Sequence, residues 1–289
     1  MPLLEKGSGL KLGADFKVGY SPERINPNDS EHTFSNTAKI VSANDGQALD
    51  EVARVYAEVV AADLCRASGI RVAEAAKMTE NVQRSVNIAL MNELQRLFSR
   101  MGIDMGEVID MASSKWNFVK YRPGLGGGHC IPVDPLYLVS AASKLGVEMP
   151  VTSSGCAVND GMAAYVVRSL LGAMGSDGRG ARALLMGVTY KENIDDIRNS
   201  RIAEMVGLLE REGMSVDVTD PHADPDKVYA MYGIRPVPAL RPPYDLIVVA
   251  VAHDEYRGLD DAYFRSISRG AALLGDIRGL YKGRIKSLG

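Results

Sequence analysis

Apolar residues recur along this chain with two different periods, one typical of helices and one typical of buried strands. Between residues 70 and 100 they recur every three or four positions, which predicts one long helix that ends near Gly102. A second helix is predicted over residues 105–112, and further helix from about residue 136 to residue 171. The middle of the chain is therefore predicted to be helical.

After residue 180 the pattern changes to short, continuous apolar runs. The runs at residues 183–188, 216–219, 246–251 and 271–274 predict strands, and helical spacing separates the first two. Strands that alternate with helices form a parallel sheet covered by helices. Because such sheets bind ligands at the carboxyl ends of their strands, the loops after Val188 and Val251 and around Asp276 are expected to lie on the functional edge.

The beginning of the chain has too few predicted strands for a stable sheet of its own. Residues 16–20 and 38–43 predict strands, and residues 45–60 predict a helix. We interpret them as the remnant of a larger domain. The predicted fold is α/β, with a remnant of an N-terminal Rossmann-like domain (residues 1–65), a central helical domain with one long helix (66–172) and a C-terminal Rossmann-like domain (173–289).

Composition excludes several classes of protein. The chain has 289 residues, 46% of them hydrophobic and 24% charged, with a net charge of −3 and no basic stripe, so a nucleic-acid partner is not expected. Its apolar runs fall short of the roughly 18 residues that a membrane helix needs. No signal peptide is visible, and three widely spaced cysteines favour reduced thiols over disulfides or a zinc site. A cytoplasmic protein without membrane insertion is the expectation.

The strongest chemical signal is the segment PGLGGGHCIPVDP at residues 123–135. Its glycines allow backbone N–H groups to approach an anionic or hydroxyl-rich ligand. If the following segment is helical, Cys130 and Asp134 lie on one face, and a helix start favours the nucleophilic thiolate. A tight turn with a buried structural cysteine is an equally good interpretation of the spacing alone.

Two further segments carry weaker signals. Lys77 and Asn81 lie four residues apart on the long predicted helix, where an ammonium and an amide on one face would stabilise an oxyanion. A solvated helix face is the simpler alternative. Glu23 and Arg24 follow Pro22 in a loop after a predicted strand, a common location for site residues.

The fourth segment, residues 187–200, lies between a predicted strand and a predicted helix. This order resembles a nucleotide-binding half-fold, but only Gly187 stands where three spaced glycines are expected. Tyr190, Lys191 and Arg198 are candidates to contact a base or phosphates, although loop charges are often only solvated.

These segments occur together, in this order, in one known family. SPERI at residues 21–25, WNF at 116–118, GGHCI at 127–131 with VDP at 133–135, and KEN at 191–193 with DIRNS at 196–200 match its pattern. The chain resembles the UDP-glucose/GDP-mannose dehydrogenase family along essentially its whole length. Within the family it is most similar to bacterial UDP-N-acetylhexosamine (UDP-GlcNAc or UDP-GalNAc) 6-dehydrogenases, which make uronic acids for surface polysaccharides.

The resemblance implies a chemistry and a role for each catalytic candidate. Members oxidise the C6 alcohol of the sugar to a carboxylate in two hydride transfers to NAD. Cys130 would attack the aldehyde intermediate and form a thiohemiacetal and then a thioester, which water hydrolyses. Lys77 would stabilise the oxyanion with Asn81 beside it, Asp134 would manage protons or position water, and Glu23 would belong to the substrate and catalytic loop.

The resemblance also implies binding residues and a partner. The predicted substrate-binding residues are Arg24, Arg122, Gly124, Gly126, Gly127, Tyr190, Lys191 and Arg278. Arg198 would reach toward NAD. The helix at residues 70–100 would bury its apolar positions against a second copy, so a homodimer is expected.

One departure from the family pattern changes the functional expectation. Family members begin with a dinucleotide-binding domain that carries a glycine fingerprint, and this sequence contains none; residues 10–20 correspond to a late part of that domain. The main NAD site is therefore expected to be absent from this chain. A non-catalytic nucleotide-sugar-binding and dimerisation fragment is the alternative function. A cysteine hydrolase or acyl transferase built on Cys130 is a third, which adjacent His129 supports only weakly.

Overall fold

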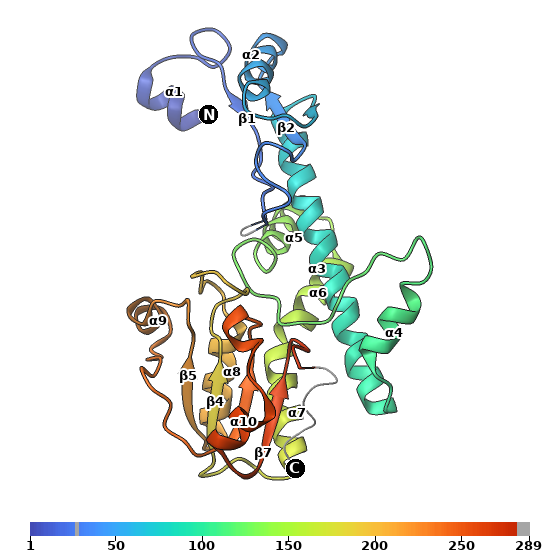
Figure 1. The fold of residues 1–289 in the computed structure, drawn as a ribbon. Coiled ribbons are helices and arrows are strands. Elements are labelled where there is room, and N and C mark those ends of the chain that lie inside the picture. Colours follow the sequence, from blue (N-terminus) through green and yellow to red (C-terminus); the bar gives the residue numbers. More distant parts are fainter. Residues whose placement is uncertain (27–28, 282–289) are drawn as a thin grey trace. The chain divides into compact units, whose positions relative to one another are not determined.

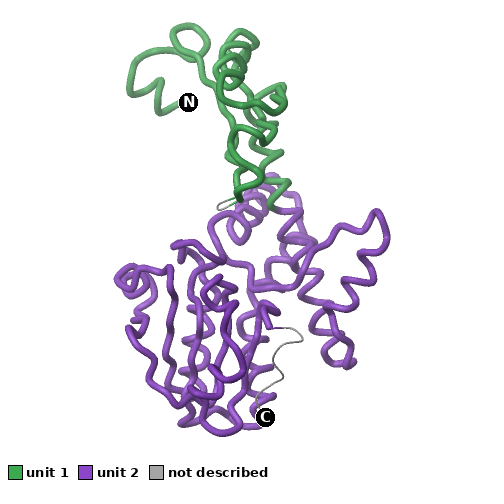
Figure 2. Tube along the Cα trace, in the orientation of Figure 1, with its two compact units in different colours: residues 1–81 green, residues 82–289 purple. Residues whose placement is uncertain are grey.

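The computed structural model describes residues 1–26 and 29–281 and divides the chain into two compact units, residues 1–81 and 82–289 (Figure 2). The boundary falls inside the long helix. The α/β class predicted from the sequence is confirmed, whereas the division at residues 65 and 172 stays a prediction.

The first unit contains a small three-stranded sheet. Its strands β1 (Gly19–Tyr20), β2 (Lys39–Ala43) and β3 (Leu64–Arg66) lie in the order β1-β2-β3, with β1 antiparallel and β3 parallel to β2. Helix α2 (Gly46–Ala57) joins the two parallel strands, and α1 (Pro2–Ser8) precedes the sheet (Figure 1). Strand β3 was not predicted, because its three residues are too few to show a period.

The long helix α3 (Ile70–Met101) confirms the prediction almost to the residue. It ends at Gly102, whose φ of +71° is a conformation that glycine adopts without strain. Helix α4 (Met105–Ala112) follows with the predicted bounds, and Met105 and Ile109 pack against Met91 of α3 in a small apolar cluster.

The prediction of further helix between residues 136 and 171 was too coarse, because three helices occupy this stretch. They are α5 (Asp134–Lys144), α6 (Pro150–Asp160) and α7 (Met162–Met174). Gly146 has a φ of +69° after the end of α5, and Pro150, which lacks an N–H group, begins α6. Gly161 separates α6 from α7.

The second unit contains a four-stranded parallel sheet, as the apolar runs predicted, and its strand order is β5-β4-β6-β7. The strands are β4 (Arg182–Met186), β5 (Ser215–Thr219), β6 (Tyr244–Val249) and β7 (Ser268–Asp276). The chain passes from β4 to β5 on one side and returns to β6 on the other, so the carboxyl ends of β4 and β6 form the point where ligands bind in such sheets.

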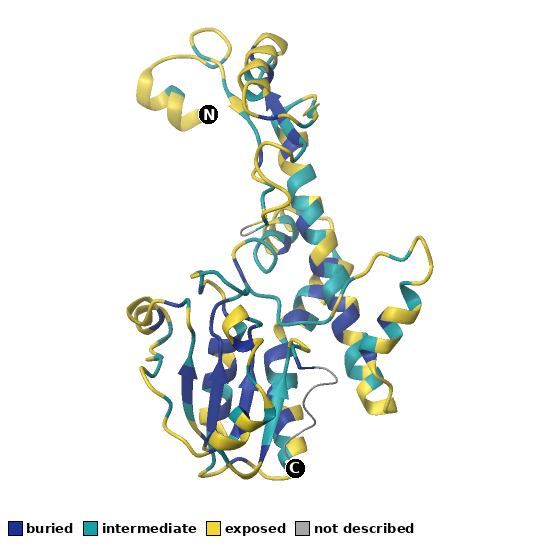
Figure 3. Cartoon of the chain, viewed as in Figure 1, coloured by how far each residue is buried: buried dark blue, intermediate teal, exposed yellow. Residues whose placement is uncertain are grey.

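Helices cover both faces of this sheet (Figure 1). Helices α7 and α8 (Arg201–Arg211) contribute to the apolar core on one face, together with residues around α9 (Pro225–Tyr232). Helix α10 (Asp261–Ile267) and the short helix η1 (Asp254–Tyr256) lie on the other. The inner strands are buried on both faces, which explains their unbroken apolar sequence (Figure 3).

Across the described residues, none of the helices combines the length and the apolar character required to cross a membrane.

Candidate functional site

The glycine-rich loop begins at a buried amide network. Asn92 of α3 is fully buried; its Oδ1 accepts a hydrogen bond from the Gly124 N–H at 2.8 Å and its Nδ2 donates to the Gly124 carbonyl at 3.1 Å. Asn92 also donates to Asn159 of α6 at 2.9 Å, and Asn159 donates to the Ser85 carbonyl at 3.0 Å. The start of the loop is thus fixed to the helices of the second unit.

The end of the same loop is fixed to the segment after β4. The Gly128 N–H donates to the Arg198 carbonyl at 3.2 Å, and Asn199 Nδ2 donates to the Gly128 carbonyl at 3.0 Å. Gly128 has a φ of +92°, and a Cβ there would lie 2.8 Å from the ring of Tyr190. A Cβ at Gly127 would lie 3.0 Å from the Asn199 carbonyl oxygen. Only glycine permits this approach.

Cys130 lies in the turn that precedes α5. The N–H of Asp134, the first residue of α5, donates to the Cys130 carbonyl at 2.8 Å, which is the spacing of one helical turn. Residues 131–133 between them form a turn and not a helix, so a shared helix face for Cys130 and Asp134 stays a prediction. The Cys130 Sγ lies 3.5 Å from Nδ1 of His129, and among the described residues no carboxylate hydrogen-bonds to that histidine.

Tyr190 and Arg198 belong to the same electrostatic neighbourhood as Cys130. Burial and the charge of Asp196 raise the pKa of the Tyr190 phenol, and Cys130 adds to the effect. Arg198 makes a bidentate contact with Asp196, with Nε at 2.9 Å and 3.0 Å from the two carboxylate oxygens. The hydrogen bond from Arg198 lowers the pKa of Asp196, against the effect of burial. The predicted substrate residue and the predicted cofactor residue thus lie close to the thiol.

Two adjoining cavities lie beside the start of the glycine loop. One, of about 610 Å³, is lined by Arg122, Arg278 and Asp276, and the other, of about 490 Å³, by Gly124 and apolar residues of α7. Both volumes lie within the roughly 300–1,000 Å³ of small-molecule sites. A Cβ on Gly124 would lie 3.6 Å from the Arg278 guanidinium. Two arginines at the edge of a glycine loop suit the oxygens of a diphosphate.

In the first unit, the loop after β1 contacts the first turns of α3. Arg24 binds Glu80 through two guanidinium nitrogens, at 2.8 Å and 3.3 Å, and donates to the Ala38 carbonyl at 2.9 Å. Burial opposes ionisation of Glu23, but backbone N–H groups and Lys39, 3.4 Å away, lower the pKa of Glu23 overall. These contacts fix the loop that carries Glu23 and Arg24.

Lys77 and Asn81 lie one turn apart on α3, also in the first unit. Asn81 is buried and Lys77 is half-buried, so this face of the helix is not an ordinary solvated one. The structure thus groups the predicted site residues into two sets. Glu23, Arg24, Lys77 and Asn81 belong to the first unit; the second contains Arg122, Gly124, Gly126, Gly127, Cys130, Asp134, Tyr190, Lys191, Arg198 and Arg278.

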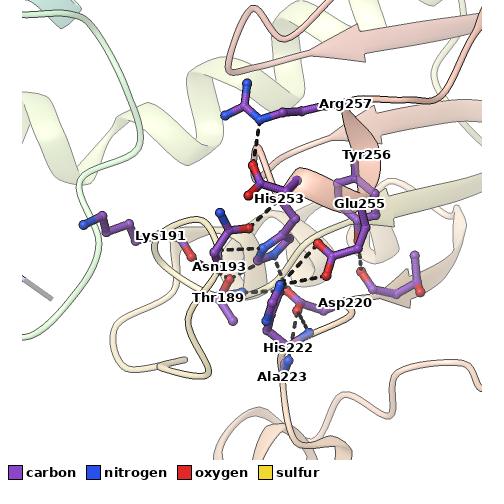
Figure 4. Close-up of polar contacts among 12 residues, drawn as sticks. Thr189, Lys191, Asn193, Asp220, His222, Ala223, His253, Glu255, Tyr256 and Arg257 are labelled. Atoms are coloured by element: carbon purple, nitrogen blue, oxygen red, sulfur yellow. Dashed lines mark hydrogen bonds and ion pairs between the residues drawn. The ribbon is translucent and has the colours of Figure 1, made fainter. Parts of the chain in front are cut away.

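The sequence reasoning missed a buried polar network at the carboxyl ends of β4, β5 and β6 (Figure 4). Its centre is Asp220, whose side chain is fully buried. The five groups that donate to its two oxygens are the backbone N–H of Val188, Thr189, His222 and Ala223 and Nε2 of His253, at 2.6–3.2 Å. Burial opposes ionisation, yet these donors hold the pKa of Asp220 far below its usual range.

His253 is the second member of this network and is also fully buried. Its Nε2 lies 3.2 Å from both Asp220 Oδ2 and the Thr189 hydroxyl, and its Nδ1 lies 3.0 Å from the Asn193 N–H. A signal for it existed in the sequence, because His253 lies two residues after Val251, in a loop already assigned to the functional edge.

The first unit contains one element that resembles part of a dinucleotide-binding domain. The unit β2–α2–β3 has the order of a dinucleotide-binding element, but Asp45 caps α2, and its carboxylate accepts the Ala48 N–H at 2.9 Å. A carboxylate at this helix end repels the phosphates that would otherwise bind there.

Two family models match the chain. Residues 71–161 match the model described as the UDP-glucose/GDP-mannose dehydrogenase family, central domain, and residues 184–283 match the UDP binding domain of the same family. The two matches cover the long helix, the glycine loop, the parallel sheet and the buried polar network.

Individual relatives extend the similarity to nearly the whole chain. A UDP-N-acetyl-D-glucosamine 6-dehydrogenase from Pseudomonas aeruginosa is 44% identical over 97% of this chain and 67% of its own length. One from Salmonella typhi is 42% identical over 96% of this chain and 66% of its own length.

Solved structures show the same fold. A UDP-D-ManNAc dehydrogenase from Pyrococcus horikoshii superposes with a TM-score of 0.84 at 26% identity, over 97% of this chain and 65% of that one. A UDP-glucose dehydrogenase from Pyrobaculum islandicum gives 0.80 at 28% identity, over 93% and 62%. The chain thus spans about two thirds of the length of the relatives that it matches.

Proposed function

The chain belongs to the UDP-glucose/GDP-mannose dehydrogenase family, and we propose that it binds a UDP-N-acetylhexosamine and oxidises its C6 alcohol to the carboxylate. The observation that carries the proposal is the glycine loop, which leads to Cys130 and lies in close contact with Tyr190. The chain that contains it is 42–44% identical to UDP-N-acetyl-D-glucosamine 6-dehydrogenases. The uronic acid would serve the synthesis of a surface polysaccharide.

Cys130 is the proposed nucleophile. Its thiolate adds to the C6 carbon of the aldehyde, a C–S bond forms, and the carbonyl oxygen takes up a proton to give the thiohemiacetal. Once oxidation has produced the thioester, water adds to the same carbon and the C–S bond breaks. The products are the carboxylate and the regenerated thiolate. The contact with His129, at 3.5 Å, supports proton exchange at this sulfur.

Four other residues would support this chemistry. Lys77 would stabilise the oxyanion, with Asn81 beside it on α3, and their half-buried and buried positions favour such a role over a solvated one. Asp134 would manage protons or position water, since it begins the helix that follows the thiol. Glu23 would act from the loop after β1, where backbone N–H groups and Lys39 lower its pKa.

The sugar nucleotide would lie along the glycine loop. Backbone groups of the loop would contact the sugar, while Arg122 and Arg278, which line the larger cavity, would bind the diphosphate. The other proposed contacts are Arg24, Gly124, Gly126, Gly127, Tyr190 and Lys191.

NAD is the hydride acceptor that the family implies, and Arg198 is the proposed contact to it. The Asp45 carboxylate at the start of α2 disfavours a phosphate of NAD at that position. The second candidate function for these residues is therefore a non-catalytic nucleotide-sugar-binding and dimerisation fragment.

The first test is calorimetric titration of the purified chain with UDP-N-acetylglucosamine in the absence of NAD. We expect saturable binding that Arg278→Gln weakens by about 10–100-fold, because a hydrogen bond to a charged group contributes about 1.5–3 kcal/mol. Arg179→Gln removes a guanidinium whose side chain is 83% exposed and lies outside the larger cavity, and serves as the matched control. If the folded chain does not bind, the proposed substrate is wrong.

A homodimer is the proposed assembly, with α3 contributing exposed apolar side chains such as Leu90 and Leu97. Light scattering at micromolar concentration should give twice the mass of the chain. A monomeric mass would exclude this assembly.

A further inference from the structure

The buried pair Asp220 and His253 is not part of the chemistry proposed above, yet it contacts the segment that carries Tyr190 and Lys191. We infer that Asp220 and His253 are positioning residues, which hold the turn at residues 189–193 in the conformation that presents Tyr190 and Lys191 to the sugar nucleotide. The role in substrate binding rests on the proposed function, whereas the holding of the turn does not.

The hydrogen bonds around His253 determine its tautomer. The Asn193 N–H can only donate, so Nδ1, 3.0 Å away, must carry a lone pair. The ring proton therefore lies on Nε2, which faces Asp220 Oδ2 and Thr189 Oγ1, both at 3.2 Å. The Thr189 hydroxyl donates to the Lys191 carbonyl at 3.0 Å, so its oxygen is available to accept. The imidazole is thus a neutral bridge between an ionised carboxylate and the turn.

The turn has one residue in an uncommon conformation. Asn193 has a φ of +59°, a left-handed conformation that asparagine adopts more readily than most residues with a side chain but less readily than glycine. His253 fixes the Asn193 N–H, and the Asn193 side-chain oxygen accepts from the Asp254 N–H at 3.0 Å. Asp220 fixes the other end of the turn through the Thr189 N–H at 3.1 Å. Both ends are therefore tied to the loops after β5 and β6.

The position of the turn determines the fit against the glycine loop. A Cβ on Gly128 would lie only 2.8 Å from the Tyr190 ring, so the loop and the ring are in close contact and a shift of the turn alters that contact. The Lys191 side chain points away from the buried pair (Figure 4).

A metal site is the competing interpretation of the same residues. His222, His253 and Glu255 offer ligand atoms that all lie within 4.8 Å of one another. Both ring nitrogens of His253 are already hydrogen-bonded, however, to the Asn193 N–H and to Asp220. A metal would have to break one of these contacts, whereas the positioning role uses both as they are.

The test uses three substitutions of His253 in the whole chain. His253→Asn places an amide oxygen near the position of Nδ1 and can still accept from the Asn193 N–H. His253→Gln places its amide near the position of Nε2, so it keeps the contact with Asp220 and loses the one with the Asn193 N–H. His253→Phe fills the volume and keeps neither. Hydrogen exchange of the Asn193 amide reports on the contact directly, and titration with UDP-N-acetylglucosamine reports on its consequence.

We expect exchange at Asn193 to be about tenfold faster, and binding about tenfold weaker, in the Gln and Phe variants, as for the loss of one buried hydrogen bond. The Asn variant should stay close to wild type in both measurements. His222→Gln is the matched control. The His222 ring lies next to that of His253, with 4.7 Å between ring centroids, but pairs with Glu255 and not with the turn. It should change neither measurement.

Unchanged exchange at Asn193 in folded Gln and Phe variants would overturn the inference, and so would an Asn variant as impaired as Phe. If the variants of His253 do not fold, Asn193→Gly and Asn193→Ala provide the second test. Glycine tolerates the φ of +59° and alanine does not, so only the alanine variant should lose affinity strongly. The two proposals can fail separately. If exchange at Asn193 is faster in the variants but the wild-type chain binds no UDP-sugar, the holding of the turn is supported and the proposed function is refuted.

Discussion

Replacing Asp220 by asparagine tests how far the sheet of the second unit depends on its buried carboxylate. The substitution preserves shape and volume but removes the charge and one of two acceptor oxygens. Two donors, the N–H groups of His222 and Ala223, converge on Oδ1. Three converge on Oδ2, from Val188, Thr189 and His253.

The loss of unfolding free energy depends on which of the five donors still have an acceptor when asparagine replaces Asp220. With its oxygen on the Oδ2 side, two backbone donors lose their acceptor and face an amide group; with the opposite orientation, three donors do. Because each buried donor without an acceptor costs about 1–3 kcal/mol, the smaller loss amounts to about 2–6 kcal/mol of unfolding free energy.

Urea unfolding followed by circular dichroism measures the loss as a shift of the midpoint. Asp224→Asn is the matched control, because Asp224 caps α9 through one oxygen, which accepts from the N–H groups of Asp226 and Lys227. Asparagine caps helices as well as aspartate does, so the control should change stability by no more than about 0.5 kcal/mol. A loss below about 1 kcal/mol for Asp220→Asn would refute the reasoning, since it is smaller than the cost of one unsatisfied donor.

Three further predictions concern the glycine loop, Cys130 and the stability of the protein at low pH. Gly128→Ala should destabilise the protein by about 2–4 kcal/mol in urea unfolding, from an unfavourable backbone conformation and a clash with Tyr190. Gly126→Ala, with open space around its Cβ, should have little effect, and equal losses would contradict the argument. Cys130→Ser should leave the affinity for UDP-N-acetylglucosamine within about twofold by calorimetry, since a nucleophile that acts on a later intermediate contributes little to binding; a large loss would assign the thiol to binding. Because the pKa of Asp220 is lowered in the folded state, its stabilisation should be complete above about pH 4 and be lost as the pH falls further. The difference in urea midpoint between wild type and Asp220→Asn should therefore narrow only below that pH, and narrowing near neutral pH would argue against an ionised Asp220.

The sequence predicted the elements whose apolar periodicity is long or unbroken. Helix α3 and strands β4 and β6 were found because each buries a continuous stripe or run. The three helices between residues 134 and 174 were merged, since Gly146 and Pro150 interrupt the pattern without changing its period. Strand β3 was missed because it is stabilised by pairing with β2 and not by its own sequence.

Proximity in the structure was predictable for residues that are close in the sequence. A backbone hydrogen bond joins Cys130 and Asp134, whereas their joint role in one site stays a prediction. The network of Thr189, Asp220 and His253 was not found, because these residues come from three separate strand ends. Each strand end was recognised, but no single-sequence pattern indicates which side chains meet there.

The two halves of the predicted binding surface depend on one another for their backbone hydrogen bonds. The Gly128 N–H is satisfied by the Arg198 carbonyl and the Gly128 carbonyl by Asn199, while Arg201 donates to the Gly126 carbonyl at 3.4 Å. An exposed loop would leave these groups to water. The end of the glycine loop is thus held by residues 198–201, and Asp220 and His253 contact the turn that precedes them. Hydrogen bonds therefore connect the buried network, the turn and the glycine loop, and we expect a change at the buried end to alter the conformation of the loop.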